Sequence, residues 1–61
     1  MTIWIKIGTH AADVLPVVRK RKPPIVGEAF YVRERGQTRP SLVLCDEIKI
    51  INGTPLYFVS R

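Results

Sequence analysis

The chain has 61 residues, of which 46% are hydrophobic, and it carries a formal net charge of +5. This length limits the protein to a single domain, 1–61, whose one core buries about 60% of the surface that the unfolded chain exposes. There is no apolar run of about 18 residues to cross a membrane and no signal-peptide pattern, so we expect a cytoplasmic protein.

Cysteine and histidine each occur once, as Cys45 and His10. A lone cysteine cannot form an intramolecular disulfide, which agrees with a reducing compartment. A structural zinc site needs four ligands of the Cys or His type in most cases, and the chain does not supply them. We therefore predict neither a metal nor a cofactor.

Residues 2–7 have the alternation that is typical of a β-strand. Ile3, Ile5 and Ile7 alternate with polar or aromatic side chains, and β-branched residues favour strands. We expect the three isoleucines to face the core, so that Trp4 points to the opposite side of the sheet.

Residues 9–24 are predicted to form a long, basic, exposed connection within the domain. The hydroxyl of Thr9 can cap one short helical turn, and Pro16 limits any such helix to about two turns. Val17 and Val18 can add a short extended piece. The run Arg-Lys-Arg-Lys then ends at two prolines, which hold the chain extended.

A second strand is predicted over residues 27–35, with Phe30 and Val32 on one face. A turn follows over residues 36–40, because glycine and proline bound it. A third and longer strand is predicted over residues 41–51.

The third strand is expected to turn Leu42, Leu44, Ile48 and Ile50 toward the core. Asp46 falls on this same face. Its position indicates either that the residue lies near a sheet edge or that a β-bulge near Cys45 and Asp46 redirects the strand.

Asn52-Gly53 is the strongest short-range signal for a β-hairpin. A two-residue loop would place Ile48 opposite Tyr57, whereas a three-residue loop would place Ile48 opposite Leu56. Because only the longer loop brings the expected core residues onto one face, we predict the three-residue loop.

These elements predict a mostly β protein. Consecutive strands form an antiparallel meander, and the N-terminal strand pairs with one of its edges. A small four- to five-stranded barrel of the SH3 or OB kind would remove the exposed edges. The alternative is a curled sheet covered by at most one short helical turn.

The sequence offers few groups that could converge in an active site, so we predict that the protein is not an enzyme. Cys45 with His10 as its base is one candidate pair, and nothing supplies the third, orienting group. Cys45 lies among apolar residues, where cysteine usually packs as a small hydrophobe. Asp46 and Glu47 are neighbours in a strand and therefore point to opposite faces.

Residues 1–40 account for the whole charge of +5, and residues 41–61 are neutral. Such asymmetry indicates one basic surface that faces an anionic partner, although a solvated loop that keeps the domain soluble gives the same pattern. Basic residues around an aromatic one are typical of nucleic-acid binding. The predicted binding residues are Arg19, Lys20, Arg21, Lys22, Tyr31, Arg33, Arg35 and Arg39.

Two functions of different classes agree with this pattern. The first is binding of nucleic acid through residues 19–22 and the neighbouring arginines. The second is docking on an acidic surface of a larger protein, as a phage-like accessory or inhibitor module. Trp4 and Tyr31 exposed beside arginines would favour bases, whereas exposed aliphatic side chains flanked by charge would favour a protein partner.

The C-terminal strand is apolar on both faces from Leu56 to Val59. A monomeric sheet normally leaves one face in water, so this pattern predicts that both faces are covered. We expect a homodimer that buries Trp4, Tyr57 and Val59 across a two-fold axis.

Overall fold

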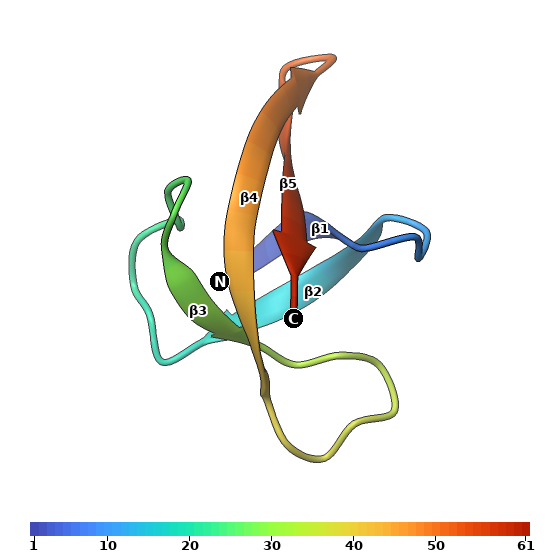
Figure 1. The fold of residues 1–61 in the computed structure, drawn as a ribbon, viewed down its shortest axis with the longest axis vertical. Coiled ribbons are helices and arrows are strands. Elements are labelled where there is room, and N and C mark those ends of the chain that lie inside the picture. Colours follow the sequence, from blue (N-terminus) through green and yellow to red (C-terminus); the bar gives the residue numbers. More distant parts are fainter.

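The computed structural model describes all 61 residues and contains five strands and no helix. The strands are β1 (Thr2–Ile7), β2 (Asp13–Val18), β3 (Ala29–Val32), β4 (Ser41–Ile51) and β5 (Thr54–Ser60). Each strand pairs with the next and β5 pairs with β1, so the sheet closes into a barrel (Figure 1). The predicted small β-barrel is therefore confirmed. No helix is present that could span a membrane.

The odd number of strands determines the direction of the closing pair. The four sequential pairs are antiparallel, so β5 runs in the same direction as β1. These two strands pair in parallel, with Trp4 opposite Leu56 and Ile7 opposite Val59. The first and last strands thus lie side by side and complete the barrel.

Ten buried side chains, two from each strand, fill the barrel interior. They are Ile5, Ile7, Leu15, Val17, Phe30, Val32, Val43, Cys45, Tyr57 and Val59. In each strand the two residues are separated by one position, as the alternation of side chains along a strand requires. The predicted inward faces of β1 and β3 are confirmed.

β2 corrects the prediction for residues 9–24. Residues 13–18 form a strand with Leu15 and Val17 buried, and the segment contains no helical turn. The alternation of these two residues with exposed Pro16 was a strand signal that the proline obscured. Residues 19–28 remain as the loop that carries the basic run.

Pro16 fits within β2 because of the direction in which its nitrogen points. The N–H of Val17 donates to the carbonyl of Met1 on the β1 side, so by alternation the nitrogen of Pro16 faces the β3 side. There the carbonyl of Pro16 accepts a hydrogen bond of 3.0 Å from the N–H of Arg33, just past the Val17–Val32 pair that ends the β2–β3 ladder. The missing donor of the proline therefore affects only the end of this ladder.

The first half of β4 faces the opposite way from the prediction. Val43 and Cys45 are buried, whereas Leu42 and Leu44 are 53% and 42% exposed. A bulge between Cys45 and Glu47 shifts the register, which confirms one of the two predicted explanations for Asp46. Because the bulge changes the phase of the alternation, apolar residues before and after it cannot be assigned to one face by counting.

The predicted three-residue loop between β4 and β5 is wrong. Ile48 lies opposite Tyr57, which leaves Asn52 and Gly53 as a two-residue loop. Both residues have positive φ, 51° and 80°, as a type I′ turn requires. The prediction assumed the wrong inward face of β5, whose buried residues are Tyr57 and Val59.

Candidate nucleic-acid interface

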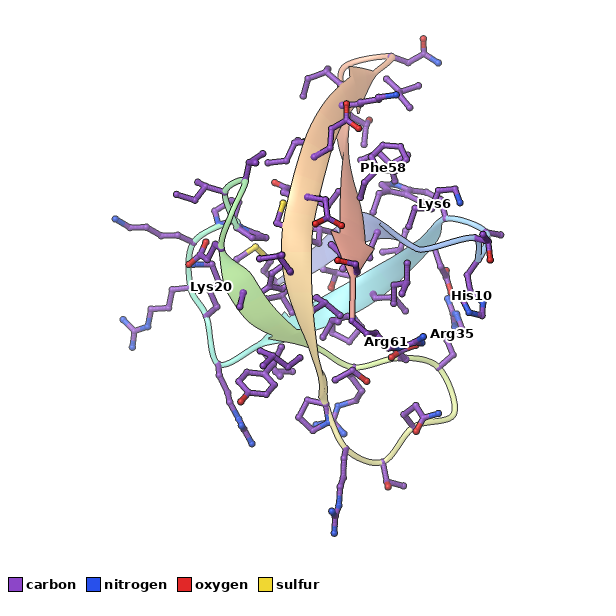
Figure 2. All side chains as sticks on the ribbon, viewed as in Figure 1. Lys6, His10, Lys20, Arg35, Phe58 and Arg61 are labelled. Carbon is purple, nitrogen blue, oxygen red and sulfur yellow. The ribbon has the colours of Figure 1, made fainter.

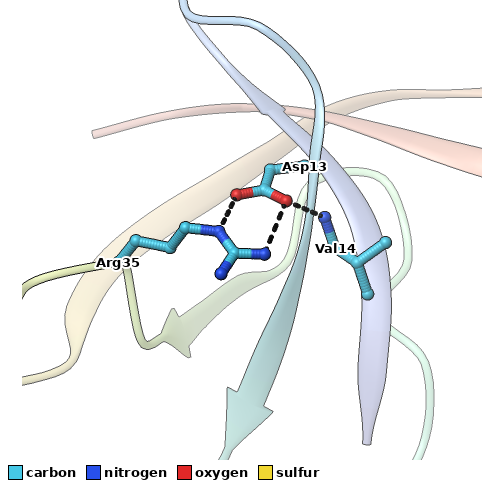
Figure 3. Close-up of polar contacts among 3 residues, drawn as sticks. All are labelled: Asp13, Val14 and Arg35. Carbon is cyan, nitrogen blue, oxygen red and sulfur yellow. Dashed lines mark hydrogen bonds and ion pairs between the residues drawn. The ribbon is translucent and has the colours of Figure 1, made fainter.

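Three of the five carboxylates form ion pairs with basic side chains. Lys20 lies 2.6 Å from Glu28, Arg61 pairs with Glu34, and Arg35 binds Asp13 through two hydrogen bonds. Figure 2 labels the three basic residues, and Figure 3 shows the contacts between Arg35 and Asp13. These hydrogen bonds lower the pKa of each of the three carboxyl groups. Two predicted binding residues, Lys20 and Arg35, therefore already have an acidic partner within the chain.

The other cations on the same part of the chain have no carboxylate partner. They are Arg19, Arg21, Lys22, Arg33 and Arg39, and all five are exposed. The first three lie in the β2–β3 loop and the last two in the β3–β4 loop, on either side of β3 (Figure 1). The two unpaired acids, Asp46 and Glu47, lie on β4 beyond this region. The two loops thus carry an uncompensated positive charge.

Arg19 and Tyr31 form the clearest geometric feature of this surface. The guanidinium carbon of Arg19 lies 4.9 Å from the centroid of the Tyr31 ring. Arg19 has a φ of 62°, in the left-handed region that non-glycine residues rarely adopt. The backbone thus turns at the end of β2 in a way that brings the guanidinium over the ring, where a cation is attracted to the π-face.

Tyr31 lies in a row of outward-facing residues across three strands. It pairs with Val18 of β2 and Leu42 of β4, and none of the three belongs to the core. Next to this row is a hollow of about 250 Å³ whose lining includes Val18, Arg19, Lys20, Glu28, Ala29 and Tyr31. The small side chain of Ala29 leaves part of this surface open.

Arg33 and Arg39 extend the positive surface beyond the end of β3. Arg33 donates a hydrogen bond of 2.9 Å from Nη1 to the carbonyl of Thr38, which ties the ends of the β3–β4 loop together. Arg39 follows Thr38 directly, so this contact keeps the two arginines near each other. Neither guanidinium has a carboxylate partner.

Trp4 lies apart from this surface. Its side chain is 44% exposed and projects from β1 beside Leu56 of β5. It lines a shallow hollow of about 310 Å³ with Ala12, Ile51, Asn52, Thr54, Pro55 and Leu56. No charged residue lines this hollow, so Trp4 does not join the aromatic and basic residues around Tyr31.

Two of the three residues predicted to self-associate belong to the core of a single chain. Tyr57 and Val59 are 6% and 3% exposed because the closed barrel covers them. The prediction assumed that only residues 9–24 could cover the second face of β5. In the closed barrel part of that cover does come from this segment, because Leu15 and Val17 of β2 lie in the same core as Tyr57 and Val59. The burial of these residues therefore requires no second copy.

Cys45 is a core residue, with 1% of its surface exposed. Burial, followed by the nearby charges of Asp46 and Glu28, raises the pKa of its thiol. A protonated and enclosed thiol is a poor nucleophile. No group of three or more His, Cys, Asp or Glu side chains is arranged to hold a metal ion.

Sequence reasoning identified the basic loop and Tyr31, and it missed the exposed apolar residues that surround them. The sequence pattern predicts that Leu42 and Leu44 face the core and that Val18 forms a short extended piece of the connection over residues 9–24. The alternation of Val43 with Cys45 predicts the correct inward face of β4 once the bulge is placed.

No protein-family model matches this chain, and no curated protein or solved structure matches it.

Proposed function

We propose that this protein binds single-stranded nucleic acid across the outer face of β2, β3 and β4. The observation that carries the proposal is the Arg19–Tyr31 stack surrounded by unpaired cations. Stacking platforms in a positively charged surface are the usual means of holding single strands, because every base has a π-face and every nucleotide has a phosphate.

The parts of the site have separate roles in this proposal. Arg21, Lys22, Arg33 and Arg39 contact phosphates, since they are exposed and have no internal acidic partner. The planar guanidinium of Arg19, held over Tyr31, presents its outer face to a base. The hollow beside Tyr31 accommodates the edge of that base or the sugar next to it.

Single-stranded nucleic acid fits this surface better than a duplex does. The structure has no helix to insert into a major groove, and its loops carry cations at scattered positions around a small aromatic platform. A single strand can turn its bases toward such a platform, whereas bases in a duplex are already stacked on each other.

The test is fluorescence anisotropy with labelled oligo(dT) and oligo(U) at a series of salt concentrations. We expect affinity to fall as salt rises, with a slope of about 0.7 for each phosphate contacted. Arg21→Gln with Lys22→Gln should reduce this slope by about 1.4, because two contacts are lost. Absence of binding at low salt would refute the proposal.

A matched control has the same net charge as the variant Arg21→Gln with Lys22→Gln. Lys6→Gln with Lys49→Gln removes two cations from β1 and β4, outside the two loops. We expect this variant to keep the wild-type slope. An equal loss of slope in both variants would show that overall charge, and not this surface, governs binding.

Docking on an acidic protein is the second candidate, and exposed aliphatic residues favour it. Leu42, Leu44, Ile25 and Val26 are between 42% and 68% exposed and lie near the basic loops. Apolar patches bordered by charge are typical of protein interfaces. Replacing Ile25 with Ser distinguishes the candidates, because Ile25 lies in the β2–β3 loop, outside the row that contains Tyr31. It should weaken a protein contact strongly and nucleic-acid binding little.

A further inference from the structure

β4 keeps an unpaired edge although the barrel is closed. β3 pairs with β4 only from Ser41 to Leu44, and Cys45 then exchanges hydrogen bonds of 2.8 and 2.9 Å with Gly27 and Glu28. Beyond Cys45, β4 continues to Ile51 with β5 as its only partner strand. Figure 1 shows this part of the β4–β5 hairpin extending past the rest of the barrel.

The turn determines which backbone groups face the open edge. In a two-residue hairpin the flanking residues, here Ile51 and Thr54, exchange hydrogen bonds with each other. By alternation Lys49 also points its N–H and C=O toward β5, whereas those of Ile48 and Ile50 point away from it. Four backbone groups are therefore available to another strand.

The charge of the molecule makes this edge more accessible to a second copy than the basic loops are. Each copy carries +5, so the basic surfaces of two copies repel each other. Residues 46–51 have no positive excess, because they carry the two unpaired acids, Asp46 and Glu47, against Lys49 alone.

Exposed isoleucine lies along the same edge. Ile50, in the open part of β4, is 66% exposed. Ile25 is 68% exposed and lies just before Gly27, whose hydrogen bond to Cys45 is the last contact of the β2–β3 loop with this edge. Edge strands are commonly protected by charge or proline. Here the charges of the open part of β4, Asp46, Glu47 and Lys49, end at Lys49, and no proline is present in that part.

We propose that two copies of this protein pair antiparallel along the open edge of β4, with the two-fold axis at Lys49. Ile48 of each copy then lies opposite Ile50 of the second copy, and all four free backbone groups of each copy are bonded. With the two-fold axis at Ile48 or at Ile50, only that one residue would form backbone hydrogen bonds with its counterpart in the second copy. This interface is distinct from the predicted one at Trp4, Tyr57 and Val59, and it does not depend on nucleic-acid binding.

The side chains agree with this register except at one position. Ile50 is covered by Ile48 of the second copy, and Glu47 lies diagonal to Lys49 of the second copy, within reach of a long side chain. Lys49 lies directly opposite its own counterpart, which is unfavourable. The register therefore predicts that removing this lysine strengthens the dimer.

The test is sedimentation equilibrium of the wild type from about 10 µM to about 1 mM, the range of weak association. We expect a monomer–dimer equilibrium. Lys49→Thr should lower Kd about threefold, because it removes the opposed like charges. Lys6→Thr, which removes the same charge from β1, should leave Kd nearly unchanged.

A second pair of variants separates the backbone from the side chain. Ile50→Pro removes an N–H that bonds nothing within the monomer, so the barrel should stay folded by circular dichroism while the dimer is lost. Ile50→Ala keeps the N–H and should retain measurable dimer. A wild type that stays monomeric to the highest concentration would overturn the proposal. A Lys49→Thr variant no tighter than Lys6→Thr would also overturn it, even if Ile50→Pro failed to fold.

Discussion

The guanidinium of Arg19 lies over the ring of Tyr31, with its central carbon 4.9 Å from the ring centroid. Arg19 directly follows β2, whereas Tyr31 lies within β3. Val18, the last residue of β2, pairs directly with Tyr31. The stack is thus fixed by the β2–β3 register. It is available to a ligand because both residues project from the outer face of the sheet.

The first prediction concerns the aromatic ring of this stack. Tyr31→Leu should raise the Kd for oligo(dT) about tenfold, because stacking of one base contributes about 1–3 kcal/mol. Tyr31→Phe should bind like the wild type, since it keeps the ring. Anisotropy at one salt concentration measures both. Equal binding by the Leu and Phe variants would remove Tyr31 from the site.

The second prediction concerns Cys45. Cys45→Ala should destabilise the barrel by about 1 kcal/mol, and Cys45→Ser by more, because burying a hydroxyl among apolar side chains costs more than burying a thiol. Urea unfolding followed by tryptophan fluorescence measures the difference. Both variants should bind oligonucleotide like the wild type when folded. Loss of binding in a folded Cys45→Ala variant would assign the thiol a role beyond packing.

The third prediction concerns pH. Ion pairs lower the pKa of Asp13, Glu28 and Glu34 in the folded chain below their ordinary values of 3.8 and 4.5. These groups therefore add stability above the ordinary pKa, and this contribution is lost as the pH falls through the folded-state pKa. We expect a nearly constant Tm from pH 7 to about 5 and a decrease below about pH 4.

Asp13→Asn provides the control for this pH dependence. The amide oxygen can still accept the hydrogen bond from Val14 N–H, but the charge that pairs with Arg35 is absent. The variant should lose less Tm between pH 7 and pH 3 than the wild type does. High salt should reduce the difference, because the pair is exposed. An identical loss in both proteins would contradict the assignment.

The fourth prediction concerns Gly53. Its φ of 80° is unfavourable for L-residues, and a Cβ at this position would meet no neighbouring atom. Gly53→Ala should therefore destabilise the protein by about 1 kcal/mol through the backbone alone. D-alanine at the same position, introduced by chemical synthesis, should restore the stability. If D- and L-alanine gave equal stability, the backbone explanation would be wrong.

Residue patterns predicted the fold where alternation was uninterrupted and failed where one residue broke it. β1 and β3 were predictable because Ile5, Ile7, Phe30 and Val32 follow a clean period of two. Pro16 concealed β2, since the absence of an N–H usually excludes a central strand. The missed strand nevertheless contributes Leu15 and Val17 to the core.

The bulge at Asp46 had the wider effect on prediction. A single extra residue reversed the faces of the first half of β4, which misplaced Leu42 and Leu44. The hairpin loop was wrong for a separate reason, because Tyr57 and not Leu56 faces inward on β5. For the candidate site, sequence could identify the cations but not their pairing. Which arginines are free depends on contacts between distant residues, such as Arg61 with Glu34.

The parallel pairing of β1 with β5 also determines when this chain can finish folding. The hairpins β3–β4 and β4–β5 join neighbouring segments and can form early, but Trp4 meets Leu56 only after nearly the whole sequence is present. Contacts so distant along the chain are formed late and slow the overall rate. On a ribosome, β1 would lack its β5 partner until β5 has left the exit tunnel. A chain truncated before β5 would lack Tyr57 and Val59 in its core and could not close the barrel.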